Sequence, residues 1–364
     1  MALTIERFEP DGGAENVAWT LAHRLAAGGD EVVVVARRAD PHARVPVRLV
    51  RVSAAWQPAR VLAFSRAAAG AAPRGAFDVV HGFSRTRHQD VYRAGGGCHA
   101  DYMERSYSRV GAWLRRGSPR HAVLLRLEAQ VFADPSQLVQ CNSSLVRDAI
   151  ARRHGVPAGR LAVIPNPVDA ERFHPGRRPT DGARLRRELG PPGPVWLFVG
   201  SGFRRKGLDT ALRALAQAGA PDAELWVAGR DDPGPWRSLA RRLGLEPRVR
   251  FLGARGDLET VYAAADAFLL PTRYDAFANA CLEAAAAGLP VVTSGANGAA
   301  EVLGAGGLVV EDPEDAAGFA KALDALAGEA ERRRVGGEAR RAAEAHGWDA
   351  HVDAVRSLYA RVAR

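Results

Sequence analysis

The chain has 364 residues, of which 47% are hydrophobic and 25% are charged, and it carries a formal net charge of +9. This length favours two domains of roughly 150 to 200 residues over a single core. No stretch approaches the ~18 uninterrupted apolar residues of a membrane-spanning helix. The acidic residues Glu6, Glu9, Asp11 and Glu15 interrupt any apolar core of a secretory signal. The sequence therefore predicts a globular protein that stays in the cytoplasm.

The cysteines exclude two further classes of protein. There are three, Cys98, Cys141 and Cys281, an odd number with no C-x-x-C pair. This pattern argues against a disulfide framework and against a structural zinc site. No His/Asp/Glu cluster in the sequence stands out as a metal site. We interpret the cysteines as small buried hydrophobic residues and expect no metal.

The positive charge is concentrated in the N-terminal half. Residues 1–175 contain 24 arginines against 16 acidic residues, whereas residues 176–364 contain 26 basic residues against 25 acidic ones. Lys206 and Lys321 are the only lysines, so part of the arginine excess reflects compositional bias. A basic surface for a partner is therefore expected in the first half.

Short apolar runs alternate along the chain with longer segments of helical period, which is the pattern of βαβ units and parallel sheets. The strands expected in the first half are Ala2–Ile5, Glu31–Ala36, Val45–Val50, Asp78–His81, Leu138–Cys141 and Leu161–Ile164. Those expected in the second half are Val195–Val199, Glu224–Ala228, Val249–Leu252, Ala267–Leu270, Pro290–Ser294 and Gly307–Val310. The pattern predicts an α/β protein with two doubly wound sheets.

A proline-rich stretch separates the two halves. Residues 165–194 hold seven prolines around one short helix candidate, Asp181–Leu189, as expected of an interdomain linker. We place the boundary there, with domains at residues 1–170 and 171–348. The last helix, expected within residues 349–364, could pack on either domain, and packing back on the first is one possibility.

Two glycine-rich turns between a strand and a helix are candidates for phosphate binding. The first is Gly12-Gly13, which runs into the helical pattern Asn16–Ala26; glycines let backbone N–H groups approach an anion at a helix N-terminus. A pair of glycines is also common in ordinary turns. Neither turn contains G-x-x-x-x-G-K-S/T, so a P-loop is excluded.

The second turn contains charged side chains as well as glycines. After the strand Val195–Val199 come Gly200 to Gly207, with the cations Arg204, Arg205 and Lys206 at the start of the helix Leu208–Gln217. Adjacent cations repel one another and the positive end of the helix dipole unless an anion lies there. A diphosphate is one such anion, and a solvated basic turn is the alternative.

Two acids occupy an otherwise apolar helix and strand at residues 273–294. The helix is expected to begin near Ala278 and to end at Gly288, with Asp275 in the preceding loop and Glu283 on the same side as Asn279. A carboxylate among apolar residues is costly to bury without hydrogen-bond partners. Vicinal ribose hydroxyls would be suitable partners for Glu283.

Taken together, these motifs resemble glycosyltransferase family 4, whose members have the GT-B fold of two Rossmann-like domains facing a central cleft. The resemblance covers nearly the whole chain: Gly12 to Glu15, Ile164 to Asp169, Phe198 to Gly207, and Asp275 to Pro290. The E-x7-E motif of the family appears as Asp275-x7-Glu283. Within the family, "GSGFRRKG", "YDAFANACLEA" and "SGANGAAEV" are most similar to bacterial lipopolysaccharide core glucosyltransferases.

The resemblance implies a retaining hexosyltransferase that uses a nucleotide-diphosphate sugar, such as UDP-glucose, without metal or other cofactor. Arg205 and Lys206 would neutralise the diphosphate, and Gly13, next to Gly12, would approach the same phosphates from the other domain. Asp275 would bind hydroxyls of the transferred sugar, and Glu283 those of the ribose. The donor would also be lined by the remaining predicted residues: Ser201, Arg204, Phe277, Ala278 and Asn279.

Two positions depart from the family pattern. Asp275 stands where members usually have Glu, one methylene longer, which affects the reach to the sugar. Ser201 replaces an arginine that many members carry, a change that the glucosyltransferase relatives share.

His99 follows the three glycines of "DVYRAGGGCHADY", at residues 90–102, where family members line the acceptor side. It is a candidate to contact the transferred sugar or the acceptor hydroxyl, with a structural histidine as the alternative.

Aromatic residues and arginines alternate in the segment 102–126, with Tyr102, Tyr107 and Trp113 among Arg105, Arg109, Arg115, Arg116, Arg120 and Arg126. Such a segment suits an anionic membrane surface, and a solvated pair of helices is the alternative. We therefore expect a lipid-linked saccharide acceptor and peripheral attachment to the inner face of the cytoplasmic membrane.

Three other functions are weighed against glycosyl transfer. A GT-B sugar-nucleotide epimerase is disfavoured by the pair Asp275 and Glu283. A basic, non-catalytic nucleic-acid-binding protein would explain the charge, but no nucleic-acid motif accompanies it. A dinucleotide oxidoreductase is disfavoured because G-x-G-x-x-G is absent.

Overall fold

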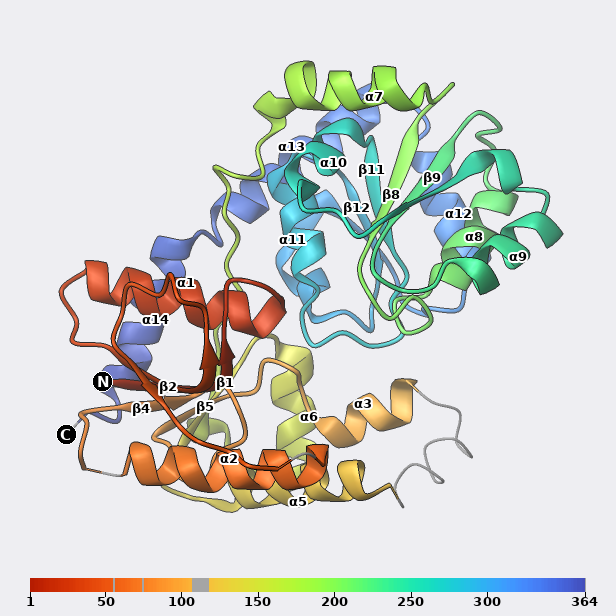
Figure 1. Cartoon of the computed structure of the whole chain (residues 1–364). Helices are drawn as coiled ribbons and strands as arrows, with labels where there is room; N and C mark the ends of the chain where they lie inside the picture. Colours follow the sequence, from red (N-terminus) through yellow and green to blue (C-terminus); the bar gives the residue numbers. More distant parts are fainter. Residues whose placement is uncertain (55, 74, 107–117, 364) are drawn as a thin grey trace. The chain divides into compact units, whose positions relative to one another are not determined.

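The computed structural model describes residues 1–54, 56–73, 75–106 and 118–363, and these residues form two compact units (Figure 1). The first unit comprises Met1–Asn166 together with Asp349–Arg364, and the second comprises Pro167–Trp348. The division falls after Asn166, slightly before the boundary at residue 170 expected from the linker. Each unit has its own parallel sheet.

The first unit contains a seven-stranded parallel sheet in the order β3-β2-β1-β4-β5-β6-β7. Its strands are β1 (Ala2–Phe8), β2 (Val33–Ala39), β3 (Val47–Leu49), β4 (Val80–Gly82), β5 (Val91–Arg93), β6 (Leu138–Cys141) and β7 (Leu161–Val163). Its helices are α1 (Gly13–Ala27), α2 (Gln57–Ala71), α3 (His99–Ser106), α5 (Pro119–Ala133), α6 (Ser144–His154) and α14 (Trp348–Ala360). The sequence predicted every strand except β5.

Strand β5 escaped prediction because it has only three residues, Val91 to Arg93, and runs directly into glycines. All three are buried between β4 and β6, so sheet pairing, and not local sequence preference, creates the strand.

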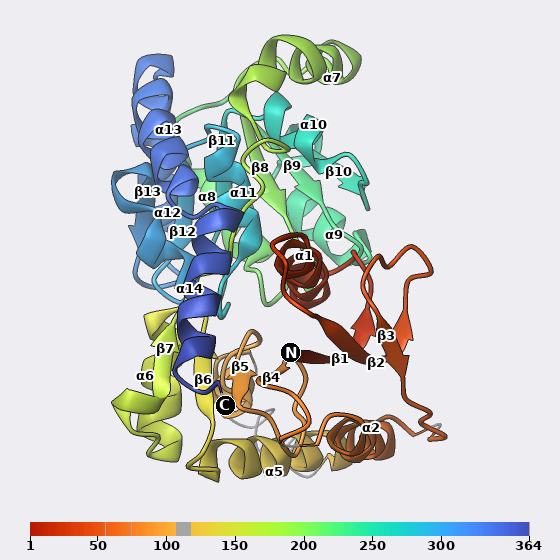
Figure 2. The same cartoon turned by 90° about the vertical axis from the view of Figure 1, so that its left-hand side faces the viewer.

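The last helix, α14, belongs to the first unit (Figure 2). The hydroxyl of Tyr359 lies 2.8 Å from Nδ1 of His81 on β4, and Arg356 forms an ion pair of 2.8 Å with Asp30. The chain therefore leaves the first unit at the linker and returns to it in its final residues.

The second unit contains a six-stranded parallel sheet in the order β10-β9-β8-β11-β12-β13. Its strands are β8 (Val195–Val199), β9 (Glu224–Ala228), β10 (Val249–Gly253), β11 (Ala267–Leu270), β12 (Val291–Ser294) and β13 (Gly307–Val310). Its helices are α7 (Ala183–Leu189), α8 (Leu208–Gln217), α9 (Gly234–Arg242), α10 (Leu258–Ala264), α11 (Asn279–Ala286), α12 (Ala316–Ala325) and α13 (Glu329–Glu344). All six predicted strands are confirmed.

Helices cover both faces of this second sheet, with α8, α9 and α12 on one face and α10, α11 and α13 on the other (Figure 1). The central strand β8, "VWLFV", is therefore buried at every residue, as continuous apolar runs in parallel sheets require. Helix α8 buries Leu208, Ala211, Leu212 and Leu215, the i, i+3, i+4, i+7 stripe of an amphipathic helix.

In both units the strand order reverses beside the first strand of that sheet, at β1/β4 and at β8/β11. Such sheets bind ligands beyond the carboxyl ends of the strands at the reversal. Both glycine-rich turns and the Asp275 loop follow these strand ends. Among the helices of residues 1–106 and 118–363, none is long and apolar enough to cross a membrane.

Candidate active site

The basic turn after β8 is packed against the loop that follows β11. Gly207 has φ +79, and a Cβ there would lie 1.9 Å from the carbonyl oxygen of Pro271. The carbonyl oxygen of Arg205 accepts hydrogen bonds from the Arg273 amide, at 2.8 Å, and from the Thr272 hydroxyl, at 3.2 Å. Glycine is therefore required at position 207 to let the turn and the loop approach.

An acid that the sequence analysis did not single out binds the start of this turn. The carboxylate of Asp231 accepts the amides of Gly202, at 2.8 Å, and of Phe203, at 2.7 Å. The hydroxyl of Ser201 accepts the Arg230 amide at 3.3 Å. The amides of residues 202 and 203 are thus occupied, and Arg204 is exposed. An anion at this turn would therefore contact its side chains more than its backbone amides.

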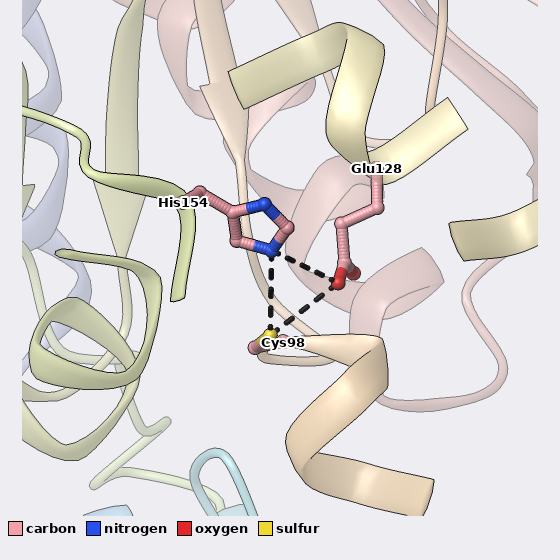
Figure 3. Close-up of side chains that lie close together, drawn as sticks. All are labelled: Cys98, Glu128 and His154. Carbon is pink, nitrogen blue, oxygen red and sulfur yellow. Dashed lines mark hydrogen bonds and ion pairs between the residues drawn. The ribbon is translucent and has the colours of Figure 1, made fainter. Parts of the chain in front are cut away.

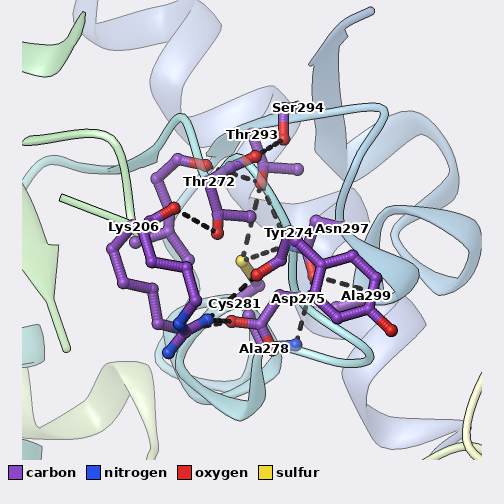
Figure 4. A network of polar contacts seen from close by, with 12 residues as sticks. Lys206, Thr272, Tyr274, Asp275, Ala278, Cys281, Thr293, Ser294, Asn297 and Ala299 are labelled. Carbon is purple, nitrogen blue, oxygen red and sulfur yellow. Dashed lines mark hydrogen bonds and ion pairs between the residues drawn. The ribbon is translucent and has the colours of Figure 1, made fainter. Parts of the chain in front are cut away.

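Asp275 forms ion pairs with the two inner cations of the turn, and Figure 4 shows the pair with Lys206. Its Oδ2 is 2.9 Å from Nη1 of Arg205 and 2.6 Å from Nζ of Lys206. Burial of this carboxyl raises its pKa, but the charges of Lys206 and Arg205 outweigh that effect, so the pKa of Asp275 is lowered. The structure therefore brings together Arg205, Lys206 and Asp275, which the sequence placed in two separate motifs.

Glu283 lies on α11, which ends at Ala286 and is followed by Gly288 with φ +78, as predicted. Its Oε2 accepts a hydrogen bond of 2.9 Å from the hydroxyl of Tyr262 on α10, a partner that sequence did not suggest. Burial raises the pKa of Glu283, whereas the Tyr262 hydrogen bond opposes the rise. As a whole residue, Glu283 is partly exposed.

Asn297, buried after β12, holds the Asp275 loop in place (Figure 4). Its Oδ1 accepts the amides of Ala278 and Ala299, each at 3.1 Å, and its Nδ2 donates to Thr293 Oγ1 at 3.0 Å and to Cys281 Sγ at 3.2 Å. The Asp275 amide also donates to the carbonyl of Ala296 at 3.1 Å. In the sequence, Asn297 is recognisable only through the resemblance of the segment "SGANGAAEV" to the family.

The network also occupies the amide of Ala278, a residue predicted to line the donor. This amide donates to Asn297 and so supports the loop. Phe277 is buried in the hydrophobic core, while Asn279 begins α11 and is partly exposed.

The first unit carries the other predicted glycines. Gly12 has φ +96 and directly precedes α1, which begins at Gly13. A Cβ at Gly12 would lie 2.8 Å from a carboxylate oxygen of Glu15. The turn therefore needs glycine at position 12 for its backbone conformation.

His99 begins α3 and is largely buried. Its Nε2 lies 2.9 Å from Nδ1 of His121, and its ring stacks on Tyr102 with centroids 5.8 Å apart. Burial and the charge of Arg85 lower the pKa of His99 to about 4, so the ring is neutral near pH 7. His99, His121, Arg85, Tyr102 and Arg120 line a pocket of about 400 Å³.

The described residues contain a cluster of possible metal ligands that does not stand out in the sequence. Cys98, Glu128 and His154 each place a possible ligand atom within 4.8 Å of the other two (Figure 3). Burial raises the pKa of the Cys98 thiol to about 12, as expected of a buried cysteine. Sequence could not reveal the cluster because Glu128 and His154 are 30 and 56 residues from Cys98.

Part of the basic and aromatic segment 102–126 lies outside the described residues, including Tyr107, Arg109, Trp113, Arg115 and Arg116. In the described part, Tyr102 stacks on His99 and Arg105 forms an ion pair of 3.6 Å with Asp101. These two side chains have partners within the protein.

The chain is similar to known glycosyltransferases in sequence and in structure. A family model described as "Glycosyltransferase Family 4" matches residues 11–172, and one described as "Glycosyl transferases group 1" matches residues 193–329. A probable transglycosylase of Burkholderia thailandensis is 31% identical over 336 residues, covering 89% of this chain and 85% of that protein. The chain belongs to glycosyltransferase family 4.

Two further comparisons place the chain within family 4. A D-inositol 3-phosphate glycosyltransferase of Corynebacterium kroppenstedtii is 35% identical over 230 residues, covering 58% of this chain and only half (50%) of that relative. The crystal structure of WaaG, a glycosyltransferase involved in lipopolysaccharide biosynthesis, matches with a TM-score of 0.82 at 25% identity and covers 99% of both chains. The two Rossmann-like units thus have the GT-B fold of the family.

The two family models also cover the candidate site. The match over residues 11–172 includes Gly12, Gly13, His99 and the Cys98–Glu128–His154 cluster. The match over residues 193–329 includes the basic turn, Asp275, Glu283 and Asn297. Of the residues predicted to bind the donor, Gly12 and Gly13 lie in the first unit, and Ser201, Arg204 to Lys206, Asp275, Phe277 to Asn279 and Glu283 lie in the second.

Proposed function

We propose that the protein is a glycosyltransferase that moves a hexose from a nucleotide-diphosphate sugar, UDP-glucose in the first instance, to a saccharide acceptor. The observation that carries the proposal is the convergence of Arg205 and Lys206 on one oxygen of Asp275, with Glu283 on the helix that follows the same loop. Two cations and two carboxylates at the carboxyl ends of β8 and β11 suit a diphosphate, a sugar and a ribose together.

The two cations would stabilise the negative charge of the leaving group. As the bond between the sugar's anomeric carbon and the phosphate oxygen breaks, negative charge grows on the nucleoside diphosphate. Fixed cations stabilise such charge without reorganisation, and one such donor is worth about 10²- to 10³-fold in rate. Arg205 and Lys206 would supply this stabilisation, so the reaction is proposed to need no metal ion.

The two acids bind hydroxyl groups. When the diphosphate approaches Arg205 and Lys206, it competes with Asp275 for their charge, and the carboxylate gains freedom to accept hydroxyls of the hexose. Glu283, held by Tyr262 through one oxygen, would accept the ribose hydroxyls with its other oxygen. Donor binding thus replaces an internal ion pair with contacts to the substrate.

The transfer is proposed to retain the anomeric configuration. A hydroxyl of the acceptor attacks the anomeric carbon on the face from which the diphosphate leaves, and its proton passes to a phosphate oxygen of the leaving group. His99, neutral at physiological pH, would donate or accept a hydrogen bond at the sugar or the acceptor hydroxyl.

The acceptor is proposed to be a lipid-linked saccharide such as lipopolysaccharide core, reached from the inner face of the cytoplasmic membrane. WaaG, which is similar over the full chain, is involved in lipopolysaccharide biosynthesis. The basic and aromatic residues of the segment 102–126 would contribute on the order of 1 kcal/mol per cation at an anionic surface. Replacing Arg115, Arg116 and Arg120 together with alanine should weaken binding to anionic vesicles more than it lowers donor hydrolysis. Equal vesicle binding would refute the membrane surface.

The test begins with a thermal-shift screen of UDP-, GDP- and ADP-sugars in buffer containing EDTA, because a bound donor raises the melting temperature. The donor with the largest shift is then incubated with lipopolysaccharide core acceptors, and the anomer of the product is determined by NMR. No shift with any sugar nucleotide, combined with tight salt-sensitive nucleic-acid binding, would refute the proposal. Free sugar or an epimer without transfer would favour the epimerase.

A further inference from the structure

Cys98, Glu128 and His154 converge from three separate elements of the first unit (Figure 3). Cys98 immediately precedes α3, Glu128 lies on α5, and His154 is the last residue of α6. The Cys98 and Glu128 side chains are buried, and the His154 side chain is 18% exposed. We propose that these three side chains form a zinc-binding site that joins the three helices.

The separations of the three atoms have the size of one face of a zinc tetrahedron. Cys98 Sγ lies 3.3 Å from Glu128 Oε1 and 3.7 Å from His154 Nε2, and the latter two atoms lie 3.4 Å apart. Bonds of about 2.3 Å to sulfur and about 2.0 to 2.2 Å to nitrogen and oxygen, at tetrahedral angles, separate ligand atoms by roughly 3.3 to 3.7 Å. A single zinc ion would therefore reach all three without rearrangement of the helices.

The second oxygen of Glu128 makes the kind of hydrogen bonds that the non-coordinating oxygen of a metal-bound carboxylate commonly makes. Its Oε2 accepts hydrogen bonds from Nη2 of Arg85, at 3.1 Å, and from the backbone amide of His99, at 2.7 Å. These partners orient the carboxylate and leave Oε1 directed at the other two ligand atoms. The guanidinium also balances the carboxylate when no ion is bound.

The donor set selects among metals. A thiolate with an imidazole and one carboxylate oxygen suits zinc, whereas calcium and magnesium prefer sites made of oxygen alone. Binding would release the thiol proton of Cys98 to solvent, with no change of oxidation state. The partly exposed His154 gives the ion an entry route, and a water molecule would complete four-coordination.

The site is tested on metal content and stability, two measurements that do not require glycosyl transfer. Tag-free protein should contain about one zinc per chain by mass spectrometry, and cobalt added after removal of zinc should give a thiolate-to-cobalt absorption band. Cys98→Ala and His154→Gln should lose the zinc and the band, whereas Cys141→Ala, which removes another buried cysteine of the first unit, should keep both. Zinc should raise the melting temperature of the wild type and of Cys141→Ala only.

Two results would overturn the site. One is a chelated wild type that takes up neither zinc nor cobalt and gains no thermal stability, which would leave a hydrogen-bonded network of the same three side chains. The other is Cys98→Ala protein with unchanged metal content. Should Cys98→Ala fail to fold, His154→Gln carries the test, because this side chain is the most exposed of the three.

Discussion

The ammonium nitrogen of Lys206 lies 2.6 Å from Oδ2 of Asp275, although the two residues are 69 positions apart in the chain. The same oxygen accepts a hydrogen bond from Nη1 of Arg205. The conflict among neighbouring cations noticed in the sequence is thus relieved inside the protein by an acid assigned to the sugar. An incoming diphosphate must compete with that acid, and this competition makes several effects measurable.

Replacing Lys206 with alanine should lower the rate of transfer by about 10²- to 10³-fold, because one fixed cation at the leaving group is lost. The fold should persist, since Arg205 still pairs with Asp275. Steady-state kinetics with the identified donor measure the effect, with Lys206→Arg as the charge-conserving control. Near-wild-type turnover of Lys206→Ala would show that the ammonium does not meet the diphosphate.

Asp275→Asn should separate nucleotide binding from transfer. The amide no longer holds Arg205 and Lys206 by charge, so UDP should bind at least as tightly as to the wild type. Transfer should nevertheless fall at least tenfold, because the hexose loses its carboxylate. Calorimetry with UDP and turnover measurements on the same preparation compare the two effects. Weaker UDP binding would contradict the competition, and Asp275→Glu, the residue usual in the family, tests the effect of reach.

Removing the hydroxyl of Tyr262 should move the pH dependence of donor use. Its hydrogen bond lowers the pKa of Glu283 against the effect of burial, so Tyr262→Phe should raise that pKa further. A carboxylate with a higher pKa is protonated at higher pH, and the KM for the donor should begin to rise at higher pH than in the wild type. KM measured from pH 5 to 8 tests this, with Glu283→Gln as the reference without a titrating group. An unchanged acidic limb would exclude Glu283 from the ribose site.

The buried histidines of the first unit should make the protein less stable in mild acid. Burial and the charge of Arg93 lower the pKa of His81 to about 3, against an ordinary value of about 6.5 in the unfolded chain. Between these values the unfolded state binds one more proton, so stability is fully present above pH ~6.5 and falls by about 1.4 kcal/mol per pH unit below it.

Urea unfolding at pH 7.0 and 5.5 measures this loss, of which His81 should account for about 1.3 kcal/mol. His81→Gln should lose less stability than the wild type between the two pH values, whereas the exposed His42→Gln should behave as the wild type. The same pH-dependent loss in His81→Gln would show that other groups cause it.

The sequence by itself determined the class of fold and singled out the charged residues of the candidate donor side. Strands such as Val195–Val199 and Ala267–Leu270 are continuous apolar runs, and that local pattern is enough to place them in buried parallel sheets. Arg205, Lys206, Asp275 and Glu283 could be named because their residue types contradict their surroundings in the sequence.

Only the tertiary structure decided which groups meet. Strand β5 exists through pairing with β4 and β6, the Ala278 amide is taken by Asn297, and Tyr262 reaches Glu283 from another helix. Cys98, Glu128 and His154 come together for the same reason. Contacts between residues tens of positions apart depend on how the sheets and helices pack, and no local periodicity or spacing records that packing.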